Sequence, residues 1–335
     1  MSTIGASMLT LADWAKLIDP SGKISLIVEM LGQTNEIVND MPFIEGNLPT
    51  GHRAVIRTGL PTVYWRLLNQ GTAPSKGTTA QITEHCGMLD AWCEVDQKLA
   101  DLNNNTNAFL MSQAHSFIDA MSQEMASTIF YGNSSTSPEE FTGLSPRYSS
   151  TSADNAQNII LGGSAGGQTD NSSIWLIGWG ENKVHGMFPK GSQAGLKHEN
   201  LGLVTVEVTA GIAGNRMRAY QNHWTWDCGV CVSDWRYAVR IPNIDISLLI
   251  AKTTAADLVE LMIKAIHRLP SLTNCKPVFY MNRTVFEMLD IQRRDDVISG
   301  GGLTMQNVDG QVQYSFRGIP VKICDALLES EDRVA

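Results

Sequence analysis

The pair of residues whose spacing most directly suggests chemistry is Cys228 and Cys231, which form a Cys-x-x-Cys motif. A redox pair of this kind usually follows a strand and opens a helix. A zinc site needs a second such pair or histidines at fixed spacing. Here both flanks, 224–226 and 232–235, are strand-like, and thiols three residues apart in a strand face opposite sides. The sequence therefore favours two buried thiols over a redox or metal role.

Other chemistry-bearing groups match no standard pattern. His85, Cys86 and Cys93 have no familiar ligand spacing, and small buried hydrophobes are the default role for such cysteines. The glycine-rich stretch 162–167 lacks the Lys-Ser/Thr pair and the apolar helix of a phosphate loop. Residues 162–166 of this stretch have the spacing Gly-x-Ser-x-Gly, but its expected role is a flexible loop, and the sequence contains no His-Glu-x-x-His. We therefore expect no catalytic residue, no metal site and no cofactor, and we predict that the chain is not an enzyme.

Composition limits the class of protein. The 335 residues are 43% hydrophobic and 18% charged, a globular balance, and the longest apolar runs are far shorter than a membrane span. Lys and Arg number 25 against 34 Asp and Glu, a net charge of −9, which disfavours a protein that wraps nucleic acid. Six cysteines in so long a chain are read as reduced thiols.

Residues 1–50 resemble an arm more than a domain. A first helix carries Trp14 and ends at Pro20, and a second amphipathic turn carries Ile27 and Leu31. Two short helices with one apolar stripe each are unstable alone in water. They must dock on the body of the same chain or on a neighbouring molecule.

Residues 52–96 are predicted to form a long hairpin. Trp65 and Trp92 would fall on its opposite arms. A two-stranded ribbon is marginal by itself, so a projecting ribbon needs a surface to lie on. The β-rich or alternating segments are 55–58, 62–67 and 89–95, with turn residues between 69 and 79.

Downstream, strands and helices mix without regular alternation, so the predicted fold class is α+β. The strongest helix spans about 106–131, with Leu110, Ile118 and Met121 among the residues of one apolar face. A second helix is predicted to start at Thr254. The remaining expected elements are strands at 174–179, 203–208, 224–241, 277–281, 312–316 and 319–324, and a helix near 284–290.

The eight tryptophans leave two interpretations open. Trp224 and Trp226 would share a strand face, which could form a carbohydrate platform, but exposed aromatics on a ribbon also fit a protein interface, which we favour. The rivals are a Trp-rich binding or tail-associated structural protein that recognises glycans, and an unrecognised cytosolic enzyme. The expected subunit-interface residues are Trp14, Ile27, Leu31, Trp65, Arg66, Pro74, Lys76, Trp92, Arg293 and Arg294.

Four stretches, in their order and spacing, resemble one known family. They are 19–24 with 31–37 and 45–47; 60–66 with 73–76; 129–133 with 141–144 and 147–148; and 184–186 with 188–192. The family is the major capsid protein of short-tailed bacteriophages, of the Hong Kong ninety-seven fold type shared by tailed phages and herpesviruses. The weaker stretch 316–321 is a general feature of such proteins.

The resemblance implies a shell-forming function. The subunit would assemble in the host cytoplasm as hexamers and pentamers into the icosahedral head that encloses double-stranded DNA, and it would reside in the virion capsid. Implied partners are other copies of the chain, a separate scaffolding protein, a portal protein and a cement or decoration protein, with no sequence-specific DNA binding and no membrane. The implied parts are an N-terminal arm (1–50), an extended β-hairpin loop (51–97), a peripheral domain with a long spine helix (98–149), an axial domain (150–305) and return strands to the peripheral domain (306–335).

Overall fold

The computed structural model describes residues 33–102, 106–163, 169–207, 216–252, 255–295, 303–308 and 311–335, without the side chains of 293–295, 303–308 and 311–313. The chain divides into two compact units. Unit 1 includes the described residues of Met88–Met125 and Gly195–Asp227. Unit 2 includes those of Thr34–Gly87, Ala126–Ala194 and Cys228–Ala335. Within the described part of the chain, no helix is long and apolar enough to cross a membrane.

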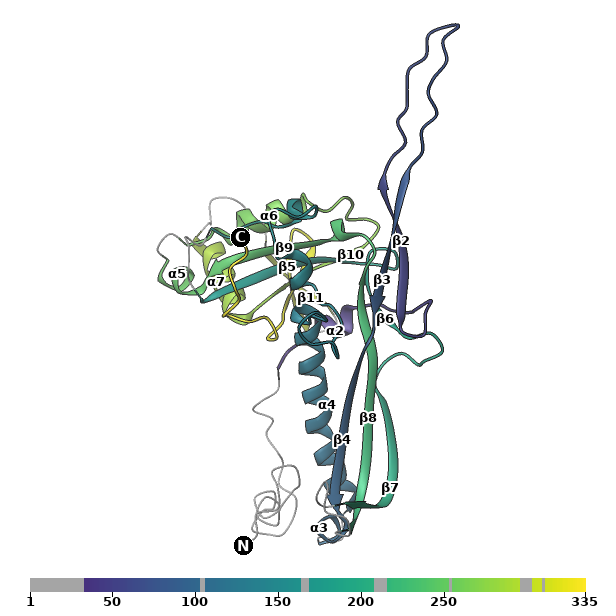
Figure 1. Ribbon diagram of the computed structural model, residues 1–335. Coiled ribbons are helices and arrows are strands. Elements are labelled where there is room, and N and C mark those ends of the chain that lie inside the picture. The colour runs from purple at the N-terminus through teal and green to yellow at the C-terminus, as the bar shows by residue number, and fades with distance from the viewer. Residues whose placement is uncertain are drawn as a thin grey trace. The chain divides into compact units, whose positions relative to one another are not determined.

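Unit 1 combines strands with the first part of the long helix α4 (Figure 1). β7 pairs antiparallel with β8, and β8 also pairs with β4. The ring of Phe117 in α4 stacks on Trp224 in β8, with centroids 5.3 Å apart, so one face of the helix is buried against the strand. The elements are β4 (Gly87–Asp96), α3 (Gln97–Asp101), α4 (Thr106–Tyr131), β7 (Lys197–Glu207) and β8 (Arg216–Val232).

The sheet of unit 2 is built around β5 (Asn171–Trp179), all of whose residues are buried. β5 pairs antiparallel with β9 (Ala238–Asp245) and β10 (Lys276–Met281), and parallel with β6 (Val184–Phe188). Such a continuous buried run is typical of a strand covered on both faces. The neighbouring strands are β1 (Phe43–Glu45) beside β6, and β13 (Ile319–Ile323), β12 (Gln311–Phe316) and β11 (Leu303–Val308) in sequence beside β10.

Short helices complete unit 2. α6 (Leu258–Ile266) is capped by Asp257, whose carboxylate accepts the amide hydrogen of Glu260 at 2.9 Å. The side chain of Gln292 in α7 (Arg283–Asp295) bonds to the backbone next to this cap, which ties α7 to α6. The remaining helices are α2 (Ile37–Asp40), α5 (Ile246–Ala251) and the 3-10 turns Ser145–Tyr148, Ala156–Asn158 and Trp235–Tyr237.

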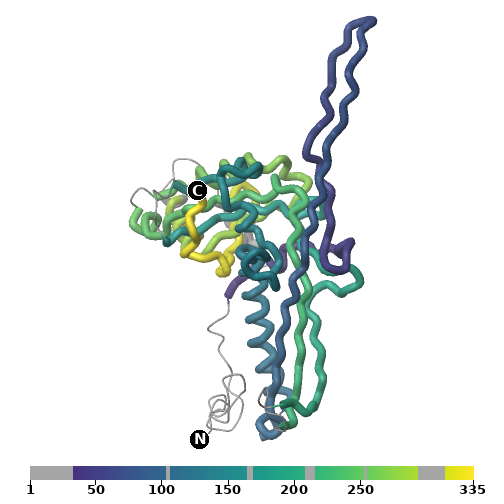
Figure 2. The backbone as a smooth tube through the Cα atoms, in the orientation of Figure 1, coloured from purple at the N-terminus to yellow at the C-terminus, as the bar shows by residue number. Residues whose placement is uncertain are grey.

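A two-stranded ribbon also belongs to unit 2. β2 (Gly51–Gly59) pairs antiparallel with β3 (Thr78–His85), from Gly51 opposite His85 to Gly59 opposite Thr78. Beyond this pairing the chain continues as two unpaired segments that stay side by side to their turn (Figures 1 and 2).

Several sequence predictions hold. α4 covers the predicted helix 106–131, and at 1.5 Å per residue it is about 39 Å long. Gly132 follows it, and the loop returns so closely that Gly143 donates a backbone hydrogen bond to Gly132 at 2.8 Å. A β-carbon on Gly132 would lie 2.5 Å from the carbonyl oxygen of Phe141, so glycine is required there. The predicted strands at 174–179, 277–281, 312–316 and 319–324 are confirmed within one to three residues.

Other predictions are wrong in detail. The second arm of the ribbon is 78–85, not 89–95, and 62–67 is not a strand; β4, which contains Trp92, pairs with β8. Trp65 and Trp92 therefore do not lie on opposite arms of one hairpin. Ile118 is 39% exposed, because it turns away from the apolar face of α4.

Two element boundaries also differ. The helix that we predicted to start at Thr254 is α6, which begins at Leu258 with Asp257 as its N-cap. Thr254 itself lies outside the described part. The expected strand 224–241 is divided between β8 and β9 by the turn Trp235–Tyr237.

Candidate functional site

Among the described residues of unit 2, the most exposed large apolar side chains lie at the end of the ribbon, residues 60–77, which we call the ribbon tip. Each of its residues is exposed. Trp65 is fully exposed, and Leu68 and Val63 are 89% and 87% exposed. Apolar side chains gathered in this way mark an interaction surface, because soluble proteins rarely leave large contiguous apolar patches in water. The large apolar residues are Leu60, Val63, Tyr64, Trp65, Leu67 and Leu68.

The predicted interface residues Trp65, Arg66, Pro74 and Lys76 all lie on this tip and are exposed. Local hydrogen bonds shape it. The hydroxyl of Ser75 donates to the carbonyl oxygen of Thr62 across the two segments at 2.6 Å. At the end of the tip the amide of Gln70 donates to the carbonyl of Leu67 at 3.2 Å.

That turn needs a residue with positive φ. Asn69 is the third of its four residues and has φ 66°, a left-handed conformation that Asn tolerates better than most residues. The tip thus has a defined turn while its apolar side chains stay exposed.

The base of the ribbon is anchored by a charged pair. Glu84 on β3 is 7% exposed. Its two carboxylate oxygens accept hydrogen bonds from the two terminal guanidinium nitrogens of Arg147, and the one between Nη2 and Oε2 is 2.7 Å long. Arg147 also donates to the carbonyl oxygens of Gly143 at 3.0 Å and Thr142 at 2.9 Å. A bidentate pair with further carbonyl partners fixes orientation as well as position. The ribbon is therefore held at its base, and the described part of the chain forms no such charged pair along the tip.

The other predicted interface residues lie elsewhere or outside the described part. Trp92 in unit 1 is 48% exposed and stacks on His223, with ring centroids 3.8 Å apart. His223 also contacts the carboxylate of Asp90 at 2.5 Å. The backbones of Arg293 and Arg294 belong to α7, but their side chains are outside the described part, as are Trp14, Ile27 and Leu31 entirely.

The tryptophans of the strands do not form a platform. Trp224 is 2% and Trp226 9% exposed, and both Trp175 and Trp179 are buried. A carbohydrate platform needs ring faces open to solvent. Their burial removes the observation that motivated the glycan-binding alternative.

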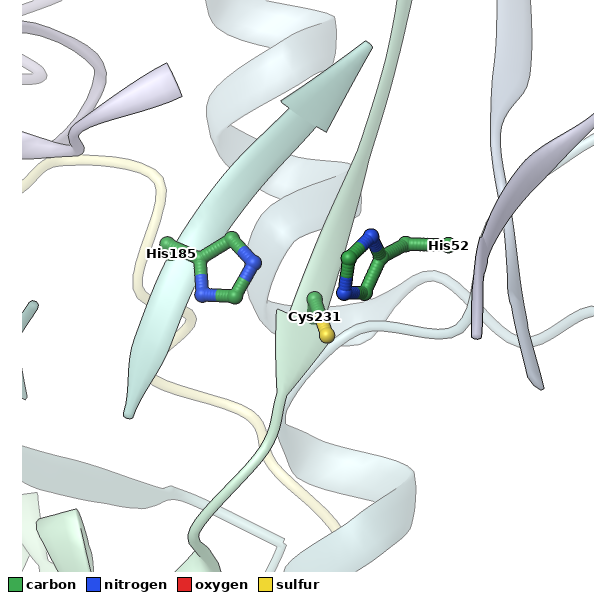
Figure 3. Close-up of side chains that lie close together, drawn as sticks. All are labelled: His52, His185 and Cys231. Atoms are coloured by element: carbon green, nitrogen blue, oxygen red, sulfur yellow. The ribbon is translucent and has the colours of Figure 1, made fainter. Parts of the chain in front are cut away.

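A second cluster was missed by the sequence. His52 on β2, His185 on β6 and Cys231 on β8 place one possible ligand atom each within 4.8 Å of one another (Figure 3). Cys231 and Cys228 are both buried, as expected of core thiols, and neither forms a disulfide within the described part of the chain. His52 is more than a hundred positions from both of the others in the sequence. The register of β6 on β8 puts His185 opposite Cys231, and His52 approaches them from β2.

Burial sets the ionisation of this cluster. It lowers the pKa of His185 to about 4, helped by the neighbouring His52 and opposed by a hydrogen bond with the backbone at Gly180. Burial likewise raises the pKa of the Cys231 thiol, against a lowering contact with Ser233. At neutral pH the ring of His185 is therefore uncharged and keeps a free nitrogen lone pair.

Comparison with known proteins identifies the family. Residues 19–335 match the family model described as Major capsid protein GP7. A chain in a structure of bacteriophage Epsilon15 is 31% identical, with a TM-score of 0.79, and the match covers 100% of this chain and 99% of that one. No curated protein sequence matches.

More distant structures also align. A capsid chain of a native GTA particle is 11% identical over 68% of this chain and 95% of its own, with a TM-score of 0.46. An encapsulin of Synechococcus elongatus is 11% identical over 71% and 96%, with a TM-score of 0.45.

The mixed α+β fold and the near-complete family match define a structural protein of the Hong Kong ninety-seven type. The chain belongs to the major capsid protein family of short-tailed phages. It is a structural component of a phage head shell and is located in the virion capsid.

Proposed function

We propose that this chain assembles through head-to-tail contacts into hexamers and pentamers, which form an icosahedral shell around the double-stranded DNA of a tailed phage. Head-to-tail contacts close into rings when the rotation between copies allows it. The ribbon tip lies on a neighbouring copy in this assembly. The exposed apolar surface of the tip is the observation that carries the proposal.

The energetics favour a contact made only on assembly. Six large apolar side chains are exposed on the tip, and complete burial of one such side chain is worth about 1.5–3 kcal/mol. A two-stranded ribbon is at best marginally stable alone, so part of this gain is offset by the ordering of the ribbon. Each contact is then moderate and reversible. A subunit held by several neighbours gains stability through multivalency.

Charge supports another copy of the chain as the partner. The tip contains Arg66 and Lys76 and no Asp or Glu, a charge of +2, whereas the whole chain carries −9. The remainder therefore carries −11, from −9 minus +2. A cationic tip suits an acidic surface, and such complementarity favours correct docking. The acidic remainder also limits adhesion of the shell to the DNA that it must release.

The parts of the subunit follow the family pattern in this proposal. The arm is 1–50, the extended loop 51–97, the peripheral domain with α4 as spine helix 98–149, the axial domain 150–305, and the return strands 306–335. A separate scaffolding protein, a portal protein and a cement protein are the proposed partners, and assembly takes place in the host cytoplasm. The chain has no catalytic role in this proposal.

A loop replacement tests the role of the tip. Gly59 pairs with Thr78, so residues 60–77 can be replaced by Asn-Gly, a dipeptide that closes two-residue hairpins. The variant retains β2, β3 and the Glu84–Arg147 pair, and it should fold with the stability of the native subunit. After coexpression with a phage scaffolding protein, electron microscopy should show no stable shells.

The matched control is Gln70→Ala, an exposed change at the end of the same tip that removes no large apolar side chain. It should form shells as the native chain does. Normal shells from the loop-replacement variant would refute the proposed role of the tip.

A further inference from the structure

Three side chains at the base of the ribbon have the chemistry of a transition-metal site. His52, His185 and Cys231 come from β2, β6 and β8, and Figure 3 shows the two imidazole rings on either side of the thiol. Their ligand atoms all lie within 4.8 Å of one another. His185 is 2% exposed, Cys231 is fully buried and His52 is half-buried.

Strand register, and not chance side-chain rotation, brings two of them together. His185 is directly opposite Cys231 in the antiparallel pairing of β6 with β8. Residues opposite one another have β-carbons about 4.5–5.5 Å apart and point to the same face of the sheet. His52 approaches from the ribbon, and its ring lies edge-on to that of His185, with centroids 5.8 Å apart at 83°.

Two nitrogens of the cluster lack partners. The Nδ1 atoms of His52 and His185 are buried, and neither forms a hydrogen bond within the described part of the chain. A buried polar atom left without a partner costs about 1–3 kcal/mol. Native structures therefore rarely keep two such atoms in one place unless something else binds them. A metal ion bound between the two rings and the thiol would take one nitrogen lone pair from each ring.

The surroundings of His185 also fit a ligand. Its ring interacts with the backbone at Gly180, and metal-bound histidines usually have an outer contact of this kind. The hydroxyl of Ser233 lies 3.5 Å from the sulfur of Cys231, where it can donate to a thiolate. Both contacts help to hold the ligand side chains in place.

We infer that His52, His185 and Cys231 bind a zinc-type divalent transition-metal ion that joins the base of the ribbon to β6 and β8. Zinc takes imidazole nitrogen at about 2.0–2.1 Å and thiolate sulfur at about 2.3 Å, and it accepts three protein ligands with water in the fourth position. Ca²⁺ and Mg²⁺ are excluded because they prefer oxygen ligands. On binding, the thiol of Cys231 loses its proton to solvent as the metal–sulfur bond forms.

Access to the fourth position comes from a cavity in the same unit. A cavity of about 1420 Å³ is lined by His52 and His185, and by Ser233 and Asp234 beyond the end of β8. The ion can enter through it, and water can complete the coordination from it. The site belongs to a single chain, so it does not depend on shell assembly or on the function of the tip.

The two buried cysteines of β8 provide a matched pair for the test. Cys231 belongs to the cluster, and Cys228 is an equally buried thiol three residues away that does not. The purified full-length subunit is freed of metal with a chelator and titrated with Co²⁺, whose thiolate-to-cobalt absorption band reports a metal–sulfur bond. The native chain and Cys228→Ala should bind one ion with this band, and Cys231→Ala should lose it.

His52→Asn guards against a folding artefact, since His52 is half-buried on the ribbon and its replacement spares the buried sheet. This variant should show native circular dichroism, lose stoichiometric Co²⁺ and Zn²⁺ binding, and lose the rise in melting temperature that Zn²⁺ gives to the native chain. A folded native chain without the cobalt band would overturn the inference. The inference would also be overturned if His52→Asn bound Co²⁺ and Zn²⁺ as the native chain does. The same holds if Cys228→Ala lost the cobalt band together with Cys231→Ala.

Discussion

The ribbon tip and the buried centre of unit 2 use the same kinds of residue in opposite ways. At the tip, Trp65 is fully exposed and stands beside the exposed Arg66. In the centre, Trp175 is fully buried, and the guanidinium of Arg240 lies over its ring at 5.3 Å. An aromatic ring and a cation that pack on each other inside one chain stabilise the subunit. The same residue types exposed to solvent add binding energy only when a partner molecule covers them.

The charged side chains of the buried centre are paired with one another and with neighbouring hydroxyl and carbonyl groups. Arg240 and Glu331 are each 3% exposed at the side chain and form an ion pair at 2.8 Å. The carboxylate of Glu331 also accepts hydrogen bonds from the hydroxyl groups of Tyr131 and Ser173. Arg240 donates to the carbonyl of Tyr148 at 3.0 Å. Such a network rigidifies a core only when each member is paired.

Glu331→Gln should therefore have the largest effect on the subunit. It removes one charge of a buried pair and leaves Arg240 uncompensated, which typically costs about 3–5 kcal/mol. The free energy of unfolding, measured by urea denaturation of the purified subunit, should fall by that amount. A loss below about 1 kcal/mol would show that water or relaxation compensates the charge, and the contrast with the tip would weaken.

The matched control is Arg236→Gln. Arg236 forms a comparable pair with Asp234 at 2.7 Å, but its side chain is 53% exposed. An exposed pair is worth about 0–1 kcal/mol. Equal losses from the two variants would mean that burial is not what distinguishes them.

The second largest effect expected on the buried centre is a loss of stability at alkaline pH. Burial raises the pKa of Tyr131, Tyr148 and Tyr280 above the ordinary value of 10. As pH rises, these phenols lose their protons in the unfolded chain before they do so in the folded chain. The stability that they contribute is therefore fully present below about pH 10 and is lost as pH rises beyond it. Each phenol contributes a slope of about 1.4 kcal/mol per pH unit there. Urea denaturation at several pH values between 8 and 11 measures how the free energy of unfolding changes with pH. Tyr148→Phe should reduce this slope, and an unchanged slope would show that the phenol of Tyr148 does not contribute to it.

How far the sequence predicts this molecule depends on how local each signal is. The helix predicted at 106–131 and the strand predicted at 174–179 each follow from residues within one segment, whose periodicity or apolar run needs no distant partner. The pairing of β4 was wrong because alternation from Leu89 to Val95 indicates one buried face and does not say which strand lies beside it.

The cluster at the base of the ribbon shows the same limit more strongly. His185 and Cys231 meet only through the register of β6 on β8, and His52 joins them from the ribbon. No motif spans these three positions in sequence. The predicted interface residues Trp65, Arg66, Pro74 and Lys76, in contrast, lie close together in the sequence and could be grouped without knowledge of strand pairing.

Trp92→Ala should have an intermediate effect, since Trp92 lies between the two extremes at 48% exposed. Its stacking on His223 is worth about 0.5–1.5 kcal/mol beyond the area that it buries. Urea denaturation should show a loss in this range. His223→Ala should cost a similar amount, and in the double variant the two losses should not add; full additivity would show that the stack contributes nothing.

Trp65→Ala should have the smallest effect on the isolated subunit, because a fully exposed side chain has no intramolecular packing to lose. Surface changes of this kind usually stay within about 0.5 kcal/mol. Its effect on shells should be the reverse, because each copy that docks its tip would lose an aromatic anchor, and such anchors carry much of the energy of an interface. Shells assembled from Trp65→Ala should dissociate at lower denaturant than native shells, while the unfolding midpoints of the two subunits coincide. Equal losses in subunit unfolding and shell survival would place Trp65 in the fold and not in the contact between copies.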